Sequence, residues 1–243
     1  MTKLFSYPLS VVYYIVFGGI LVVFDGLQRI SYLFGYQSHK VCVDVLNFFL
    51  LRGLNTLGTR IVFDMPFKLD KNQSYIIVAN HQSTYDIPPL IWYFRKVHPK
   101  FVGKKELGKG IPSISFNLRN GGSVLIDRKN PKQALIAIKA FGEQLALTNR
   151  SAIIFPEGTR SKNHEPRPFK FAGLLTLMKA MPEAKLIGVS ISNSWKITRY
   201  GNFPLGIGTK MILTAHPPID VPTENKEKVL KVIEKTIGNG IQS

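Results

Sequence analysis

The sequence predicts an α/β fold in which a mostly parallel central sheet is covered by helices, with a membrane-associated helical segment at the N-terminus. From residue 59 onward, short apolar runs alternate with segments of helical periodicity, a pattern typical of parallel sheets covered by helices. Polar clusters follow several of the strand-like runs, as ligand-binding loops do in such sheets. Before residue 25, a long stretch without charge predicts contact with lipid.

The N-terminal segment, residues 1–58, is expected to form membrane-associated helices. Residues 4–24 carry no charged side chain, and a bilayer-spanning helix needs about 20 apolar residues. Serine, proline and glycine residues interrupt the run, so a spanning anchor and a helix embedded in one leaflet are both consistent with it. A second apolar stretch, 41–51, is too short to span alone. The connector 29–40 combines aromatic and basic residues that suit the headgroup level of a bilayer.

The remaining residues, 59–243, are expected to form one α/β domain. An Asn130–Pro131 pair predicts the start of an amphipathic helix, since asparagine caps helices well and proline is favoured in the first turn. The predicted strands are 59–63, 75–80, 101–103, 123–126, 152–155, 186–192 and 211–215. One helix is predicted to carry Asp86 and a proline in its first turn, and further helices are predicted at 131–147, 172–181 and 224–237.

The net charge of the chain indicates the chemical class of its partner. Lys and Arg total 32 against 15 Asp and Glu, which gives a formal net charge of +17. Such an excess predicts an anionic partner: a nucleic acid, an acidic lipid surface or a phosphorylated substrate. The basic residues are dispersed and no nucleic-acid-binding signature is present, so we expect no nucleic-acid partner. The single cysteine, Cys42, excludes an intrachain disulfide and is typical of a chain folded in a reducing compartment.

The stretch 75–86 organises the predicted domain. An apolar, β-branched run ends abruptly in polar residues, with His81 at the exit of the strand and Asp86 five residues later. A turn between strand and helix can fold the carboxylate back onto the imidazole, which fixes one ring nitrogen and leaves the other free as a base. A surface histidine beside a helix-capping aspartate is the simpler interpretation of this pair alone.

Three further polar clusters follow predicted strands, and in a parallel sheet their loops would converge with His81 on one crevice. Arginine matches phosphate oxygens with two parallel hydrogen bonds, so Arg128 and Arg160 are candidate phosphate ligands. A tight turn at Gly158 could present backbone amides to the same phosphate, and Glu157 could hold Arg160 or receive a substrate hydroxyl. The candidate binding residues are Lys104, Lys105, Arg128, Glu157, Gly158, Thr159 and Arg160, with Lys162, Arg167 and Lys170 extending the basic rim.

At these residues the chain resembles the glycerolipid acyltransferases. The block Asn80-His81-Gln82-Ser83 with Asp86 looks like the H-x4-D signature of that family. Residues 122–128 resemble its second block, and residues 155–161 resemble its third. The likeness covers roughly residues 70–195 and is greatest to the bacterial 1-acyl-sn-glycerol-3-phosphate acyltransferases. Gly188 stands where the fourth block of the family usually has proline.

The resemblance implies a fold like that of glycerol-3-phosphate acyltransferases and an enzyme of phospholipid biosynthesis. Such an enzyme moves an acyl chain from acyl-CoA or acyl-carrier protein to the sn-2 hydroxyl of lysophosphatidic acid, giving phosphatidic acid. It implies His81 as general base, Asp86 as its orienting partner, and acceptor-binding roles for Arg128, residues 157–158 and Arg160. It also implies a helical pair that holds the site against the bilayer, at the cytoplasmic face of the bacterial inner membrane.

The chemistry needs no cofactor beyond the acyl donor, and no cluster in the sequence has zinc-ligand spacing, so we expect no metal. Three alternatives stay open. Ser83 could form an acyl-enzyme intermediate, although no G-x-S-x-G elbow surrounds it. The acceptor could be another lysophospholipid or a lyso-aminolipid. The chain could also be a basic peripheral membrane-binding module without catalysis.

Overall fold

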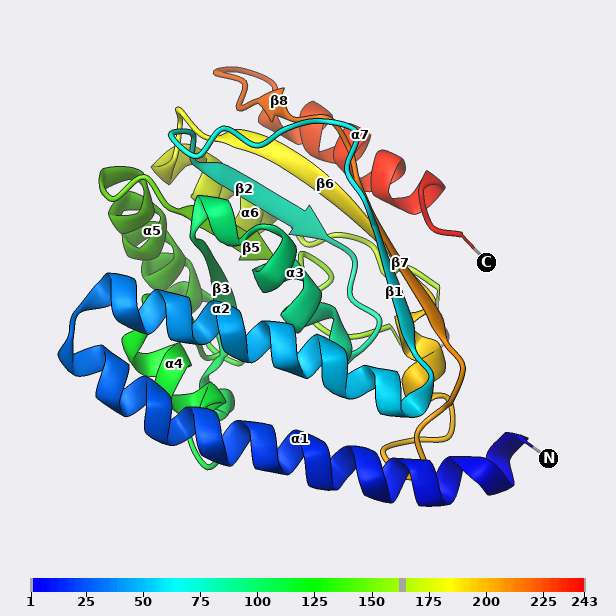
Figure 1. Ribbon diagram of the computed structural model, residues 1–243. Helices are drawn as coiled ribbons and strands as arrows, with labels where there is room; N and C mark the ends of the chain where they lie inside the picture. The colour runs from blue at the N-terminus through cyan, green and yellow to red at the C-terminus, as the bar shows by residue number, and fades with distance from the viewer. Residues whose placement is uncertain (1, 162–164, 243) are drawn as a thin grey trace.

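A computed structural model describes residues 2–161 and 165–242 as a central sheet with helices on both faces and a long helical pair along one side (Figure 1). The strands lie in the order β1-β7-β6-β2-β5-β3-β4, with β8 paired to β6. Pairing is parallel except where β6 meets β7 and β8, so the predicted mostly parallel sheet is confirmed. The strands are β1 Arg60–Asp64, β2 Tyr75–Ala79, β3 Pro99–Lys104, β4 Val124–Ile126, β5 Ser151–Ile154, β6 Lys185–Ser192, β7 Lys210–Ala215 and β8 Ile219–Asp220.

Strand β2 lies in the middle of the sheet and is buried on both faces. Its alternate side chains enter different cores: Ile76 and Val78 pack against α5, α6 and α7, whereas Ile77 packs against α3. Cover on both faces explains why the strand is a continuous apolar run and not an alternating one. Each predicted strand has a counterpart within two residues of its predicted ends. Strand β8 has only two residues, too few for a sequence pattern.

Helices on the two faces of the sheet complete the domain. The predicted helix 131–147 is confirmed with the same bounds, and its start is capped by the Asn130 side chain, which accepts a hydrogen bond from the Gln133 amide at 3.1 Å. The helices α5, α6 and α7 cover one face, and α3 covers the other. The bounds are α3 Ile87–Tyr93, α4 Ile114–Asn120, α5 Pro131–Leu147, α6 Phe171–Ala180 and α7 Lys226–Asn239.

The N-terminal segment forms an antiparallel pair of long helices, α1 Thr2–Leu33 and α2 Tyr36–Gly53, drawn in blue along the lower side of Figure 1. The expected connector 29–40 is therefore wrong, because the chain turns only at 34–35. Helix α1 continues past the first charged residues since Asp25 and Arg29 pair one turn apart at 2.8 Å. The helical pair packs directly on the rest of the chain. Its division from residues 59–243 as a separate segment, 1–58, stays a prediction.

Two different sides of α1 meet different surroundings. On its inner side, Ser10 accepts a hydrogen bond from the Leu205 amide at 2.8 Å, and Asp25 accepts one from the Ser113 amide at 2.6 Å. On its outer side, large apolar side chains such as Ile15 and Val22 are exposed. Residues Lys3–Leu33 are long and apolar enough to cross a membrane by length and composition. A surface of this kind indicates association with lipid.

Candidate active site

The four strands followed by polar clusters, β2, β5, β3 and β4, are consecutive neighbours in the sheet and mutually parallel. Their carboxyl ends therefore lie at the same edge. This arrangement confirms the prediction that the four loops converge.

The turn after β2 folds back on itself through a capping box. Ser83 accepts a hydrogen bond from the Tyr85 amide at 3.2 Å, and the Asp86 carboxylate accepts one from the Ser83 amide at 2.9 Å. A short 3-10 segment, Thr84–Asp86, then leads into α3, whose first turn holds Pro88 and Pro89. These local bonds aim the carboxylate back toward the strand exit.

The predicted contact between His81 and Asp86 is present. His81 Nδ1 lies 2.8 Å from Asp86 Oδ2, with Asp86 fully buried and 12% of the His81 side chain exposed. A carboxylate can only accept, so Nδ1 carries the proton and donates it. The other ring nitrogen, Nε2, is left with a free lone pair and can act as a base.

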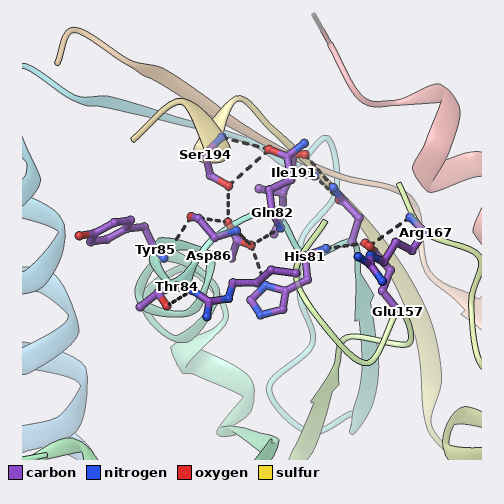
Figure 2. A network of polar contacts seen from close by, with 12 residues as sticks. His81, Gln82, Thr84, Tyr85, Asp86, Glu157, Arg167, Ile191 and Ser194 are labelled. Carbon is purple, nitrogen blue, oxygen red and sulfur yellow. Dashed lines mark hydrogen bonds and ion pairs between the residues drawn. The ribbon is translucent and has the colours of Figure 1, made fainter. Parts of the chain in front are cut away.

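The loop after β5 holds His81 from the other side. The His81 amide donates to Glu157 Oε1 at 2.7 Å (Figure 2). The His81 carbonyl accepts from the Ser161 amide at 2.8 Å. The Phe155 ring stacks on the imidazole with 4.1 Å between ring centroids. Sequence reasoning did not select Phe155 as a site residue. The signals for it were its position at the end of a predicted strand that was expected to border the site and its place as the first residue of the block 155–161.

Glu157 is placed differently from the expectation that it holds Arg160 or receives a substrate hydroxyl. Its carboxylate is buried, and its second oxygen accepts a hydrogen bond from the Arg167 amide at 3.1 Å. Burial raises the pKa of Glu157, while the hydrogen bonds from the amides of His81 and Arg167 oppose that rise. Both oxygens thus bind main chain, so the carboxylate fixes the backbone beneath the imidazole. The turn itself needs Gly158, whose φ is 72°.

Cations from two further loops lie near the imidazole. Arg128 and Lys104 line the same cavity as His81, and Arg160 Nη1 donates to the Thr84 hydroxyl at 3.0 Å, three residues from His81. The pKa of Arg128 is lowered, chiefly because the cavity wall takes it partly out of water and also because the Arg160 cation lies nearby. The Arg160 guanidinium is therefore close enough to Arg128 to disfavour its charge.

The other candidate residues lie outside this cluster. Lys105 and Thr159 are exposed and do not line the cavity. Lys104, by contrast, lines the cavity and pairs with Glu106 at 3.1 Å. Arg167 contributes its backbone amide to Glu157, and Lys162 lies outside the described residues.

A cavity of about 300 Å³ opens beside the imidazole. Its walls are mostly apolar and come from α1, α2, α3, β3 and α4, so the helical pair helps to build it. The apolar lining includes Phe17, Val43, Leu46, Leu50, Ile91, Val102, Ile114 and Leu118. Lys100, at the start of β3, also lines it and is only 8% exposed. Burial lowers the pKa of Lys100 to about 8.

The sequence profile of the acyltransferase family matches residues 60–192, which is more than half of the chain. The chain belongs to the acyltransferase family. The match begins at β1 and ends with β6, so it contains each of the four loops at the site. It does not include the helical pair.

Similar proteins carry a more specific name. This acyltransferase is 36% identical over 163 residues to a 1-acyl-sn-glycerol-3-phosphate acyltransferase of Helicobacter pylori, covering 63% of this chain and 62% of that protein. It is 28% identical over 166 residues to the protein of that name from Saccharomyces cerevisiae, covering 66% and 52%. The alignments thus span less than two thirds of either relative.

A solved structure has the same fold over nearly the whole length. The crystal structure of the 1-acyl-sn-glycerophosphate acyltransferase PlsC from Thermotoga maritima superposes with a TM-score of 0.78 at 24% identity, covering 99% of this chain and 96% of that one. The predicted α/β fold of acyltransferase type, including the helical segment at the N-terminus, is thereby confirmed.

The geometry also bears on alternatives raised by the sequence. Ser83 is buried, and its hydroxyl caps the turn, so a substrate cannot reach it as a nucleophile.

Gly188 does not line the cavity. It faces α7, where an added Cβ would lie 3.2 Å from the Ile237 side chain. Among residues 2–161 and 165–242, no three His, Cys, Asp or Glu side chains gather where they could hold a metal.

Proposed function

We propose that this acyltransferase transfers an acyl chain from acyl-CoA or acyl-carrier protein to the sn-2 hydroxyl of lysophosphatidic acid, forming phosphatidic acid. The observation that carries the proposal is the position of His81. The His81 side chain, which carries the free ring nitrogen, lines the mostly apolar cavity together with Arg128. Names of similar proteins support the choice of acceptor.

His81 and Asp86 supply the proton chemistry. As the acceptor oxygen attacks the thioester carbonyl, Nε2 of His81 takes the hydroxyl proton, and the Asp86 carboxylate stabilises the imidazolium that forms. When the tetrahedral intermediate collapses, the carbon–sulfur bond breaks and the imidazolium returns the proton to the departing thiolate. General-base help of this kind typically contributes about 10²–10⁴-fold in rate.

Arg128 and Arg160 position the acceptor. A phosphate monoester between the two guanidinium groups would make charge-assisted hydrogen bonds to both, which holds the rest of the acceptor at a fixed distance from His81. The acyl chain of the donor then lies in the apolar cavity, with its thioester carbonyl at the mouth beside the imidazole.

We expect the helical pair to hold this site at a lipid surface. Helix α1 is bonded to the body of the protein near both ends, through Ser10 and Asp25. A helix held along the body in this way cannot cross the bilayer without burying the domain, so its apolar outer side would enter one leaflet. We expect the enzyme at the cytoplasmic face of the bacterial inner membrane, where acyl-CoA and acyl-carrier protein are available.

A panel of acceptors tests the proposal. Purified enzyme in mixed micelles is given lysophosphatidate, lysophosphatidylcholine or monoacylglycerol, each with a ladder of acyl-CoA and acyl-carrier-protein donors. We expect phosphatidate as the main product and at least tenfold lower kcat/KM with acceptors that lack a phosphate monoester, since each charged hydrogen bond is worth about 1.5–3 kcal/mol. Equal use of monoacylglycerol would overturn the assignment of the acceptor.

A further inference from the structure

The Asp86 carboxylate is held on both of its oxygens by different parts of the chain. Oδ2 accepts from His81 Nδ1 at 2.8 Å and from the amides of Gln82 and Ser83 at 2.7 and 2.9 Å. Oδ1 accepts from the Ser194 hydroxyl at 2.5 Å (Figure 2) and, at the longer distance of 3.4 Å, from the Ser83 hydroxyl. Ser194 lies 108 residues further along the chain, and none of the matched sequence blocks drew attention to it.

Side chains on either side of His81 bring Ser194 to this place. Asn80 exchanges hydrogen bonds with the backbone of Ile191 at 2.9 and 2.7 Å, which fixes the end of β6. Asn193 then turns the chain with a φ of 65°, and the Ser194 amide donates to Gln82 Oε1 at 3.1 Å. Residues 80 and 82 therefore hold the segment that carries Ser194 against the segment that carries the imidazole.

The Ser194 hydroxyl has one proton and two acceptors within reach. Gln82 Oε1 lies 3.4 Å from Ser194 Oγ, whereas Asp86 Oδ1 lies 2.5 Å away. The shorter contact to an ionised acceptor is the stronger bond, so the proton points at Asp86. Both side chains are fully buried, so water does not compete for this bond.

We propose that Ser194 is a positioning residue for acyl transfer, which orients the Asp86 carboxylate so that Oδ2 stays against His81 Nδ1. The terminal torsion of an aspartate side chain is broad and roughly two-fold, so a carboxylate with donors on one oxygen only can rotate away from its partner. The Ser194 hydroxyl makes the shorter of the two donor contacts to Oδ1, 2.5 Å against 3.4 Å from Ser83, and so restrains this rotation most. The inference rests on the proposed function, in which His81 is the base, and it adds a residue that never touches substrate.

The first test compares variants of two buried serines, Ser192 at the end of β6 and Ser194 two residues beyond it. Ser194→Ala removes the donor, and Ser194→Cys removes it while nearly keeping the side-chain volume, because a thiol is a weak donor. The control is Ser192→Ala, which removes a buried hydroxyl that accepts from the Gln242 amide at 2.9 Å and does not contact Asp86. We expect both Ser194 variants to lose at least tenfold in kcat with KM for both substrates within about twofold, and Ser192→Ala to stay within about twofold in kcat.

The second test places Ser194→Ala in an Asp86→Asn background. If Ser194 acts through the carboxylate, its loss changes the residual kcat of Asp86→Asn by less than about twofold, because coupled residues are non-additive. A merely structural role would lower kcat by the same factor in both backgrounds, and that result would overturn the inference. It would also be overturned if the Ser194 variants matched the wild type in kcat.

Wild-type turnover of lysophosphatidate separates this inference from the function on which it rests. A folded wild type that produces no phosphatidate would overturn the proposed function, and the inference with it. An active wild type together with fully active Ser194 variants would overturn the inference alone. Thermal unfolding of each variant in detergent identifies any change in kcat that comes from loss of fold.

Discussion

The imidazole of His81 is fixed by contacts from its own turn after β2 and from the distant loop after β5. Asp86 binds its ring nitrogen, Phe155 covers its face, and Glu157 accepts its backbone amide. A catalytic base held in this way needs little reorganisation when the acceptor binds, and such preorganisation is the main source of rate enhancement in many enzymes.

Glu157→Gln tests whether the backbone clamp matters for turnover. The carboxylate accepts from two backbone amides, whereas a glutamine side chain has one acceptor oxygen and would present an NH₂ group to the second amide. We expect kcat to fall about tenfold or more, as for loss of a buried hydrogen bond to a charged group. Steady-state kinetics with both substrates measures this, and a variant with unchanged kcat would show that the clamp is dispensable.

Substitutions of Arg160 test whether its guanidinium group binds the phosphate of the acceptor. We expect Arg160→Ala to raise KM for lysophosphatidate roughly tenfold with little change in kcat, and Arg160→Lys to restore little, because lysine cannot make two parallel bonds to phosphate. Lys179→Ala, at an exposed position on α6, is the control for loss of one positive charge. Equal KM for the lysine and arginine enzymes would argue against bidentate binding.

At this scale the sequence predicted the contact between His81 and Asp86, because a five-residue turn after a strand has few ways to fold. It could not predict the contacts of Phe155 or Ser194. Each depends on which strands are neighbours in the sheet, and a stretch of apolar and hydroxyl residues at the end of a strand carries no local sign of that.

Among the elements, the helical pair departs most from expectation. Hydropathy ended the first helix near Asp25, whereas α1 extends to Leu33. Two polar residues in the C-terminal part of α1 face the body of the protein. Gln28 and Asp25 bind Ser113, which directly precedes α4, so polar side chains there mark contact with the body of the protein. A hydropathy profile averages the residues on both sides of a helix, so it does not separate the side that packs on the protein from the exposed apolar side.

Charges on the outer side of α1 should release the enzyme from lipid. Ile15→Glu with Val22→Glu places two carboxylates on a side whose residues are 69% and 63% exposed. We expect binding to anionic vesicles to fall at least tenfold in a sedimentation assay, since each charge opposes insertion of an apolar surface. The matched control is Ile136→Glu with Leu147→Glu on α5, two exposed apolar residues outside the helical pair. Equal loss in both pairs would place the lipid contact elsewhere.

Over the whole molecule, the sheet order explains why loops from distant parts of the chain form one site. Strands β2, β5, β3 and β4 are adjacent and parallel, so their following loops share one edge. Alternation of strands and helices predicted this convergence. The antiparallel pairing of β6 with β7 was not predictable, because the connection through η5, Ser194–Thr198, and the loop beyond it has no repeating pattern.

The cavity also affects the stability of the whole protein. Burial lowers the pKa of Lys100 to about 8 from 10.5, so the folded state disfavours its charge. Between about pH 8 and 10.5 the unfolded chain binds more protons, and stability contributed by this group rises with pH. Below pH 8 Lys100 is charged in both the folded and the unfolded chain, so the full free-energy cost of burying its charge lowers the stability of the folded state.

We therefore expect Lys100→Met to increase the free energy of unfolding at pH 7 by roughly 1–3 kcal/mol and to flatten the dependence of stability on pH above 8. Denaturant unfolding in detergent across this range measures both effects. Lys179→Met, an exposed lysine, is the control for general gains from methionine. A less stable Lys100→Met enzyme would indicate that the ammonium group has a stabilising partner within the cavity.

The turnover number of His81 variants is the most direct test of the proposed mechanism. With lysophosphatidate and a long-chain acyl-CoA at saturation, His81→Ala and His81→Gln should each lower kcat by about 10²–10⁴-fold while the proteins keep the wild-type unfolding midpoint. A folded His81→Ala enzyme that retains wild-type kcat would contradict the assignment of His81 as the base, and with it the mechanism built around that imidazole.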